Sequence, residues 1–304
     1  MEKEFIYKSR SFSSCIQAAY KLLCENTRNI LRCTWLPVLL LGILSGIFVT
    51  INMRDPRIEA LVEAHTGWFL AFFAISIPAI LVCAFWALAR LMSMLNGQRR
   101  RWNVMRLLGI FAFEVIIVAV ASALIWGGVW LLARHLGADI PTTLTDNWVV
   151  VLAALLVVFL LSLPLNYVFM RYLIDEDANL LSFKAYRTGL RYLGFIFITY
   201  FITGIITGII TLIISIPLII LVTAHTYSIV GYLNGDPLGM PAHFIALHAA
   251  TYAVTLILLW YVSMFVLLVT LFMYGSIEKQ REERRNTRLT DNDTDTDNSE
   301  NASL

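Results

Sequence analysis

Charged residues are scarce in this chain of 304 residues: Asp, Glu, Lys and Arg make up 14% of it, whereas 59% is hydrophobic. A soluble domain usually has about 25% charged and about 45–50% apolar residues. Because the apolar residues form long runs, the shortage of charge excludes an ordinary soluble protein. The net charge is only +2, and the basic residues are spread over several segments, which argues against nucleic-acid binding.

Sequence motifs of catalysis and cofactor binding are also missing. The chain has no CxxC, no HExxH, no phosphate-binding GxxxxGK[ST] loop and no GxSxG. The aspartates at 291–297 alternate as in a calcium loop, but the glycine and the bidentate glutamate of that loop are absent. We therefore expect a protein that is not an enzyme, and the cofactor stays unknown.

Long apolar runs dominate what the sequence does contain. Six stretches are long enough to cross the roughly 30 Å hydrocarbon core as helices; they lie at about 34–52, 68–91, 107–132, 148–170, 193–222 and 246–274. The predicted fold is an all-α, polytopic membrane bundle of six transmembrane helices. We expect three parts: a cytoplasmic amphipathic segment (1–33), a six-span membrane domain (34–276) and a charged, largely disordered cytoplasmic tail (277–304).

The basic residues predict the orientation of the chain. All but three of the 23 Lys and Arg residues lie in the N-terminal segment, between spans 2 and 3, between spans 4 and 5, or after span 6, the exceptions being Arg54, Arg57 and Arg134. Basic residues near the ends of spans stay in the cytoplasm. We therefore predict a multi-pass protein of the bacterial inner membrane with both termini in the cytoplasm.

Two segments that precede spans are alike. "SFSSCIQAAYKLL" begins at residue 11 and "SFKAYRTGLRYLG" at residue 182. In the second segment Phe183, Tyr186 and Leu190 share one face of a helix, and basic residues share another. Both segments are typical of short interfacial helices with a basic face towards anionic head groups.

These entry segments and the six-span plan over about 11–275 resemble a loose group of membrane proteins. The group includes uncharacterised six-helix inner-membrane proteins of the Bacteroidetes type and the membrane domain of some glycerophosphodiester phosphodiesterases. The resemblance implies a six-helix membrane fold. It does not imply phosphodiesterase activity, because the soluble catalytic domain is missing from the sequence.

Glu114 is the one acidic residue inside a predicted span. A charged side chain at the centre of a membrane helix costs about 2.5–3.5 kcal/mol on insertion scales, so Glu114 should face protein or water. Candidate partners at a similar depth are Arg90, Asn166 and Tyr167. Two interpretations stay open: a proton or cation relay, or a structural buried carboxylate.

The histidines are a second candidate site. His65, His225 and His243 fall in the outer half of the predicted topology, where carboxylates also occur. Imidazole and carboxylate groups can bind a metal ion. Their spacing forms no local motif, so such a site would have to be assembled from different loops, and the metal stays unknown.

Hydroxyl residues recur every four positions in "TYFITGIITGIITLIIS", which occupies 199–215. The row advances 40° per step, so it winds around the helix and cannot line a straight pore. Gly204 and Gly208 form a GxxxG beside Thr203, Thr207 and Thr211, which favours a seam for helix packing. Leucine at either glycine should then destabilise the bundle, and single Thr→Val changes should be mild.

Three functional hypotheses follow from the sequence. The first is a non-enzymatic membrane protein that organises or handles lipid, or another membrane partner. The second is a small transporter of a solute or ion that uses Glu114, and the third is a membrane-embedded metalloenzyme with outer-side histidines. The expected partners are membrane lipids, with a membrane protein or a second copy of the chain as a further possibility.

Overall fold

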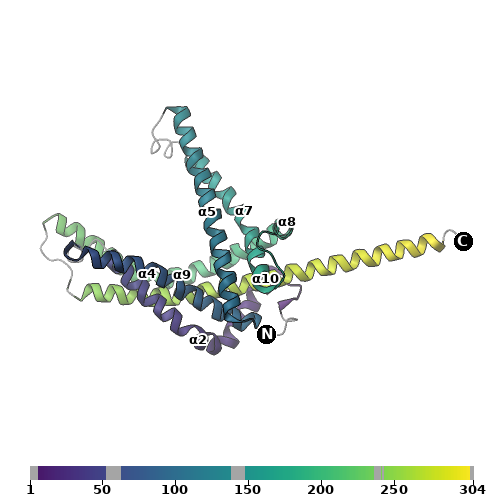
Figure 1. Cartoon of the computed structure of the whole chain (residues 1–304), viewed down its shortest axis with the longest axis horizontal. Helices are drawn as coiled ribbons and strands as arrows, with labels where there is room; N and C mark the ends of the chain where they lie inside the picture. Colours follow the sequence, from purple (N-terminus) through teal and green to yellow (C-terminus); the bar gives the residue numbers. More distant parts are fainter. Residues whose placement is uncertain (1–5, 53–62, 138–147, 236–240, 242, 302–304) are drawn as a thin grey trace. The chain divides into compact units, whose positions relative to one another are not determined.

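Seven helices make up the part of the chain that the structure describes, and no strand occurs in it. The structure, a computed structural model, describes residues 6–52, 63–137, 148–235, 241 and 243–301 (Figure 1). The helices are α2 (Phe12–Ile51), α4 (Thr66–Asn96), α5 (Arg100–Leu136), α7 (Trp148–Ile174), α8 (Phe183–Arg191), α9 (Leu193–Leu233) and α10 (Phe244–Asn301).

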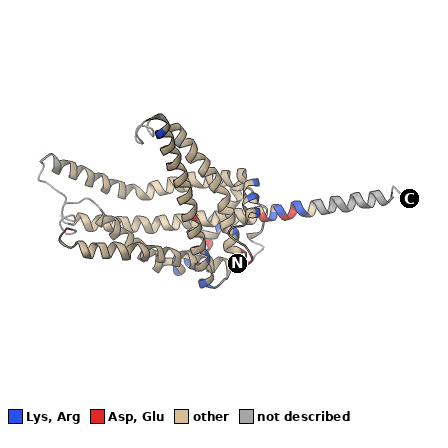
Figure 2. Cartoon of the chain, turned by 45° about the horizontal axis from the view of Figure 1, so that its top comes forward, with Lys and Arg blue, Asp and Glu red and all other residues tan. Residues whose placement is uncertain are grey.

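Six of these helices, all but α8, are long and apolar enough to cross a membrane. Each contains one of the six predicted runs, so the predicted all-α, multi-pass membrane fold is confirmed. Figure 2 shows long stretches of these helices without a charged residue, and charges gathered near helix ends. The prolines predicted inside spans, namely Pro37, Pro78, Pro164 and Pro217, all lie inside helices.

The chain divides into two compact units. Unit 1 comprises Met1–Ala18, Met105–Tyr200 and Val269–Leu304, and unit 2 comprises Ala19–Val104 and Phe201–Leu268. Each unit therefore joins segments that are far apart in the sequence.

Unit 2 is held together by a close crossing of α2 and α10. A Cβ atom added at Gly42 would lie 2.9 Å from the carbonyl oxygen of Ala253, and one added at Gly46 would lie 2.7 Å from that of Ala249. Real side chains essentially never approach a backbone that closely, so only glycine fits at both positions. Small residues four apart on both helices let the backbones meet, as in other membrane helix pairs.

Unit 1 joins the N-terminal segment to α10. The backbone N–H of Arg10 donates to the hydroxyl of Ser276 over 2.9 Å, and that hydroxyl donates to the carbonyl of Arg10 over 2.9 Å. Ile6 is buried and lies against Gly275, where a side chain would collide with its backbone. The N-terminal segment is thus docked by paired hydrogen bonds and close packing.

The two predicted entry segments have different structures. The second forms the separate helix α8, whereas the first is the beginning of the 40-residue helix α2. No glycine or proline occurs between Phe12 and Leu36 to interrupt that helix. Whether either segment lies in the membrane interface stays a prediction.

Helix α10 runs on past residue 276 to Asn301, and whether the expected cytoplasmic tail is disordered stays a prediction. The stretch "EKQREERR" at 278–285 consists of strong helix formers and has no glycine or proline. It can therefore extend the last membrane helix beyond its apolar part.

Candidate functional site

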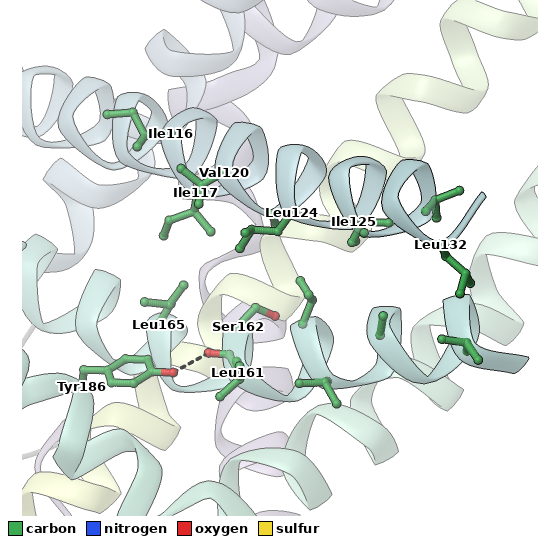
Figure 3. Close-up of a pocket in the computed structure, with 17 residues that line it drawn as sticks. Ile116, Ile117, Val120, Leu124, Ile125, Leu132, Leu161, Ser162, Leu165 and Tyr186 are labelled. Atoms are coloured by element: carbon green, nitrogen blue, oxygen red, sulfur yellow. Dashed lines mark hydrogen bonds between the residues drawn. The ribbon is translucent and has the colours of Figure 1, made fainter. Parts of the chain in front are cut away.

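Unit 1 contains an apolar groove between α5 and α7, with a volume of about 910 Å³. Figure 3 shows Ile116 near one end of the groove and Leu132 near the other. Apart from Ser162 and Tyr186, the side chains that line it carry no polar atom; representative ones are Ile117, Ala121, Gly128, Ala154, Val158 and Leu165. A volume of this size lies within the range of about 300–1,000 Å³ typical of ligand pockets.

Arg106 joins α5 to α7 on the N-terminal side of Ile116. Its buried guanidinium donates hydrogen bonds to the backbone carbonyls of Tyr172, Asp175 and Glu176, and it lies over the ring of Tyr172, 4.5 Å from its centroid. These carbonyls belong to the C-terminal end of α7, where a positive charge is favoured by the helix dipole and by the unsatisfied carbonyl groups. The clamp fixes the spacing of the two helices at this end.

Two further contacts continue the clamp towards the groove. A Cβ atom at Gly109 would be 3.4 Å from the hydroxyl of Tyr172, so the helices are close there. Phe113 and Phe169 then meet edge to face, with ring centroids 6.1 Å apart. Beyond these rings, the side chains of α5 and α7 leave an open space between the two helices, which is the groove.

Helix α8 lies at the same end of the groove. Its first turn is capped by Ser182, whose side chain accepts from the N–H of Ala185. Gly189 packs against Pro164 of α7, where an added Cβ atom would lie 2.9 Å from the carbonyl oxygen. This close fit allows Tyr186 to reach the groove, where its hydroxyl donates to the carbonyl of Leu161 over 2.9 Å (Figure 3).

Charge and apolar side chains are both exposed on α8 and just before it. Lys184, Arg187 and Arg191 are exposed. Leu181 and Phe183 are 83% and 78% exposed, which is unusual for large apolar side chains beside cations. In water such exposure would be unfavourable, whereas at a lipid headgroup boundary both kinds of side chain are accommodated.

A cluster of tyrosines and carboxylates lies elsewhere in unit 1. Tyr274 donates to the Asp175 carboxylate over 3.0 Å, and Tyr167 donates to Glu278. Tyr7 meets the ring of Tyr274 edge to face, with centroids 6.2 Å apart. Burial, followed by the nearby Asp175 charge, raises the pKa of the Tyr7 hydroxyl. The cluster joins the N-terminal segment, α7 and α10 through neutral tyrosines hydrogen-bonded to carboxylates.

Glu114, Asn166 and Tyr167 of the predicted membrane-embedded site all belong to unit 1. Glu114 lies exposed on α5 and takes part in no ion pair within the described part of the chain. Tyr167 instead bonds Glu278, and the side-chain amide of Asn166 donates to the carbonyl of Leu163 in its own helix.

Arg90 belongs to unit 2, where its guanidinium has other neighbours. It donates to the carbonyl of Cys33 over 2.9 Å and lies over the Trp86 ring, 4.8 Å from its centroid. These contacts already satisfy part of its hydrogen-bonding capacity and join α4 to α2. A relay that includes Glu114 stays a prediction.

The three predicted histidines lie in different surroundings. His65 is exposed beside the start of α4, and His243 is exposed just before α10. His225 is buried and stacks on Phe244, with ring centroids 5.9 Å apart. Among the residues that the structure describes, no group of three or more His, Cys, Asp and Glu could hold a metal ion.

The threonine row of α9 is the more buried side of its helix. Thr203 is 1% exposed, and Thr207 and Thr211 are half-buried. The glycines beside it differ from the expected seam, because no described atom lies within 4 Å of a Cβ atom added at Gly204 or Gly208. The spacing of the glycines alone did not indicate which helix they would meet.

Two features were missed by reasoning from the sequence. The first is the packing of "GILSG" (42–46) on α10, although Ala249 and Ala253 also have the small-residue spacing of four that signals it. The second is the groove, for which no local signal exists, because it depends on how α5 and α7 pair.

Comparison of the chain with protein-family models, with curated proteins and with solved structures finds no match in any of the three. The resemblance suggested by the entry segments therefore stays an expectation, and the function has to be argued from the groove itself.

Proposed function

We propose that this integral membrane protein handles lipid and is not an enzyme: an apolar lipid chain occupies the groove between α5 and α7, and a phosphate-bearing headgroup meets α8. The groove is the observation that carries the proposal. It lies between two helices that are apolar enough to cross a membrane, and nearly all of its lining is hydrocarbon.

The position of the polar groups supports this assignment. Ser162 and Tyr186, the two polar side chains of the lining, lie towards one end of the groove, and the exposed cations of α8 lie on another face of the helix that supplies Tyr186. A lipid has the same asymmetry, with a polar group at one end of an apolar chain. In the orientation that the basic residues favour, this end faces the cytoplasm of a bacterial cell, and the protein lies in the inner membrane.

The test compares two neighbouring positions on α5. Ile117 lines the groove, whereas Val118 does not and is 62% exposed. We expect Ile117→Trp to weaken phosphatidylglycerol binding at least tenfold in native mass spectrometry of the purified protein, and Val118→Trp to leave it unchanged. Equal effects of both variants would contradict the proposal. The proposal would also be contradicted if the wild-type protein were a dimer without bound lipid and Ile117→Trp converted it to a monomer. A second copy of the chain would then fill the groove.

A transporter is the second candidate, and the position of Glu114 supports it. By the 100° step of a helix, Glu114 lies on the same side of α5 as the groove-lining Ile117 and Ala121. A carboxylate at the end of an apolar groove would suit a lipophilic cation. Glu114→Gln should then abolish proton-dependent uptake of a lipophilic cation into vesicles without loss of folding. Unchanged uptake of that cation would exclude a relay through Glu114.

A further inference from the structure

Unit 2 buries two imidazole groups at one end of the crossing of α2 and α10. His248 of α10 is 0% exposed, and His225 of α9 is 8% exposed. Along α2, Thr50 lies about one helical turn beyond Gly46, and its hydroxyl oxygen is 3.3 Å from Nδ1 of His248. The contact between small residues of α2 and α10 therefore ends in buried polar side chains.

The hydrogen bonds of Thr50 determine which nitrogen of His248 carries the proton. The hydroxyl of Thr50 donates to the carbonyl of Gly46 over 2.8 Å, so its oxygen accepts the Nδ1–H of His248 over 3.3 Å. The other nitrogen of the ring, Nε2, then has a lone pair. It is buried and has no hydrogen-bond partner among the described residues. Nε2 is therefore the atom at which His248 would take up a second proton.

Aromatic rings surround both imidazole groups. Phe244 stacks on His225 with ring centroids 5.9 Å apart, and its centroid is 6.3 Å from that of His248. Of the titratable side chains on the helices that meet here, α9 supplies His225 and α10 supplies Tyr252, whose ring centroid is 5.3 Å from that of His248. The contact from α2 is the uncharged Thr50. No described ion pair includes any of these residues, so the described surroundings offer no counter-charge to a protonated ring.

From these contacts we propose that Thr50, His225, Phe244 and His248 form an acid-sensitive switch, which holds α2, α9 and α10 together while both imidazole rings are neutral and lets them separate when a ring is protonated. A charge buried without a partner is costly. In water an imidazole takes up a proton near about pH 6.5, so acid favours states in which the rings reach water. In the predicted orientation this end of the helices lies on the outer side of the membrane, and the switch responds to external acid. It belongs to unit 2 and does not depend on the groove of unit 1.

Two neighbouring histidines provide a matched test. His243 is exposed just before α10, whereas His248 is buried within it. His248→Asn keeps a donor at the δ position for Thr50 but does not titrate in this pH range. His225→Phe keeps a flat ring against Phe244 and removes the other imidazole. His243→Asn is the control, and if one of the two buried variants fails to fold near neutral pH, the other carries the test.

The first measurement is the midpoint of thermal unfolding in detergent, at about pH 7.5 and at about pH 5. We expect the midpoints of the wild type and of His243→Asn to fall by about 5 °C or more on acidification, and those of His248→Asn and His225→Phe to fall by less than about half as much. An equal fall in the wild type and in both buried variants would overturn the inference. So would a protection by His243→Asn equal to that by His248→Asn.

Amide hydrogen exchange locates the change within the protein. After correction for the direct effect of pH on exchange, we expect the amides of residues 244–252 to exchange about tenfold faster or more in the acidified wild type, and to stay protected in His248→Asn. Unchanged protection of these amides in the acidified wild type would place the acid response elsewhere and overturn the inference.

Discussion

Two GxxxG motifs in this chain have opposite surroundings. In α2, Gly42 and Gly46 meet the backbone of α10, so closely that a methyl group at either position would collide with it. In α9, Gly204 and Gly208 have no described atom within 4 Å of where a methyl group would be. The contrast shows that small residues permit a close approach without causing one, because a helix surface of matching shape must meet them.

The two glycine pairs differ in what surrounds them. At the α2 crossing, Gly46 meets Ala249 and Ala253 of α10, and Gly42 meets Ala253 and the side chain of Ile257. Around the glycines of α9, large side chains such as Ile205, Ile209 and Leu212 are exposed. Four predictions test this comparison, from the largest expected effect to the smallest.

Gly46→Leu should have the largest effect. An added Cβ atom would already lie 2.7 Å from the Ala249 carbonyl oxygen, so a leucine would force α2 and α10 apart. We expect a loss of stability of about 3 kcal/mol or more, measured as a lower midpoint of thermal unfolding in detergent. Gly204→Leu is the matched control: it loses no described packing, and the helix preference of leucine over glycine should raise stability by about 0.5 kcal/mol. An equal loss in both variants would show that the α9 glycines also pack against something, such as a second copy.

Gly46→Ala should be milder, because it sets two effects against each other. Alanine favours a helix over glycine by about 1 kcal/mol, but its methyl group would lie 2.7 Å from the Ala249 carbonyl oxygen and 3.1 Å from the Ala253 side chain. We expect a net loss of about 1 kcal/mol in the same unfolding measurement. A gain in stability would mean that the helices can separate slightly without cost.

Gly208→Ala should have the opposite sign. Its methyl group would meet no described neighbour, so only the helix preference of alanine remains. We expect a gain of about 0.5–1 kcal/mol, seen as a higher unfolding midpoint than that of the wild type. A loss of stability would indicate that another helix contacts this face.

Thr207→Val should have the smallest effect. The hydroxyl of Thr207 donates to the carbonyl of Thr203 over 2.8 Å, which is a contact within its own helix. That carbonyl is part of the helical backbone, and valine keeps the shape of the side chain, so stability should change by less than about 0.5 kcal/mol. A larger loss, with Gly208→Ala unchanged, would assign a specific partner to the hydroxyl row.

Reasoning from the sequence was accurate where the signal is local. The six spans and the absence of strands follow from the length of the apolar runs, because a backbone in lipid has to satisfy its hydrogen bonds within a helix. It was less informative where two segments must meet. Asn166 and Tyr167 lie at a depth similar to that of Glu114, but depth does not determine which side of a helix faces a neighbour.

The candidate site illustrates the same limit. Tyr186 was predicted on the apolar face of an entry helix, and the structure has a helix there. That Tyr186 reaches a groove depends on Gly189 fitting against Pro164, and the groove itself depends on Arg106 binding the end of α7. These residues are far apart in the sequence, and their types alone indicate no partner.

By itself, the sequence determined that this chain forms an all-α, multi-pass membrane protein, because hydrophobicity and length act on each helix separately. Only the tertiary structure decided that Gly42 and Gly46 pack closely while Gly204 and Gly208 meet no described atom, and that α5 and α7 are joined at one end and leave a groove beyond it. The physical reason is that a close contact depends on the shapes of two surfaces at once. In an apolar chain many pairs of surfaces have the same composition, so the local fit decides between them.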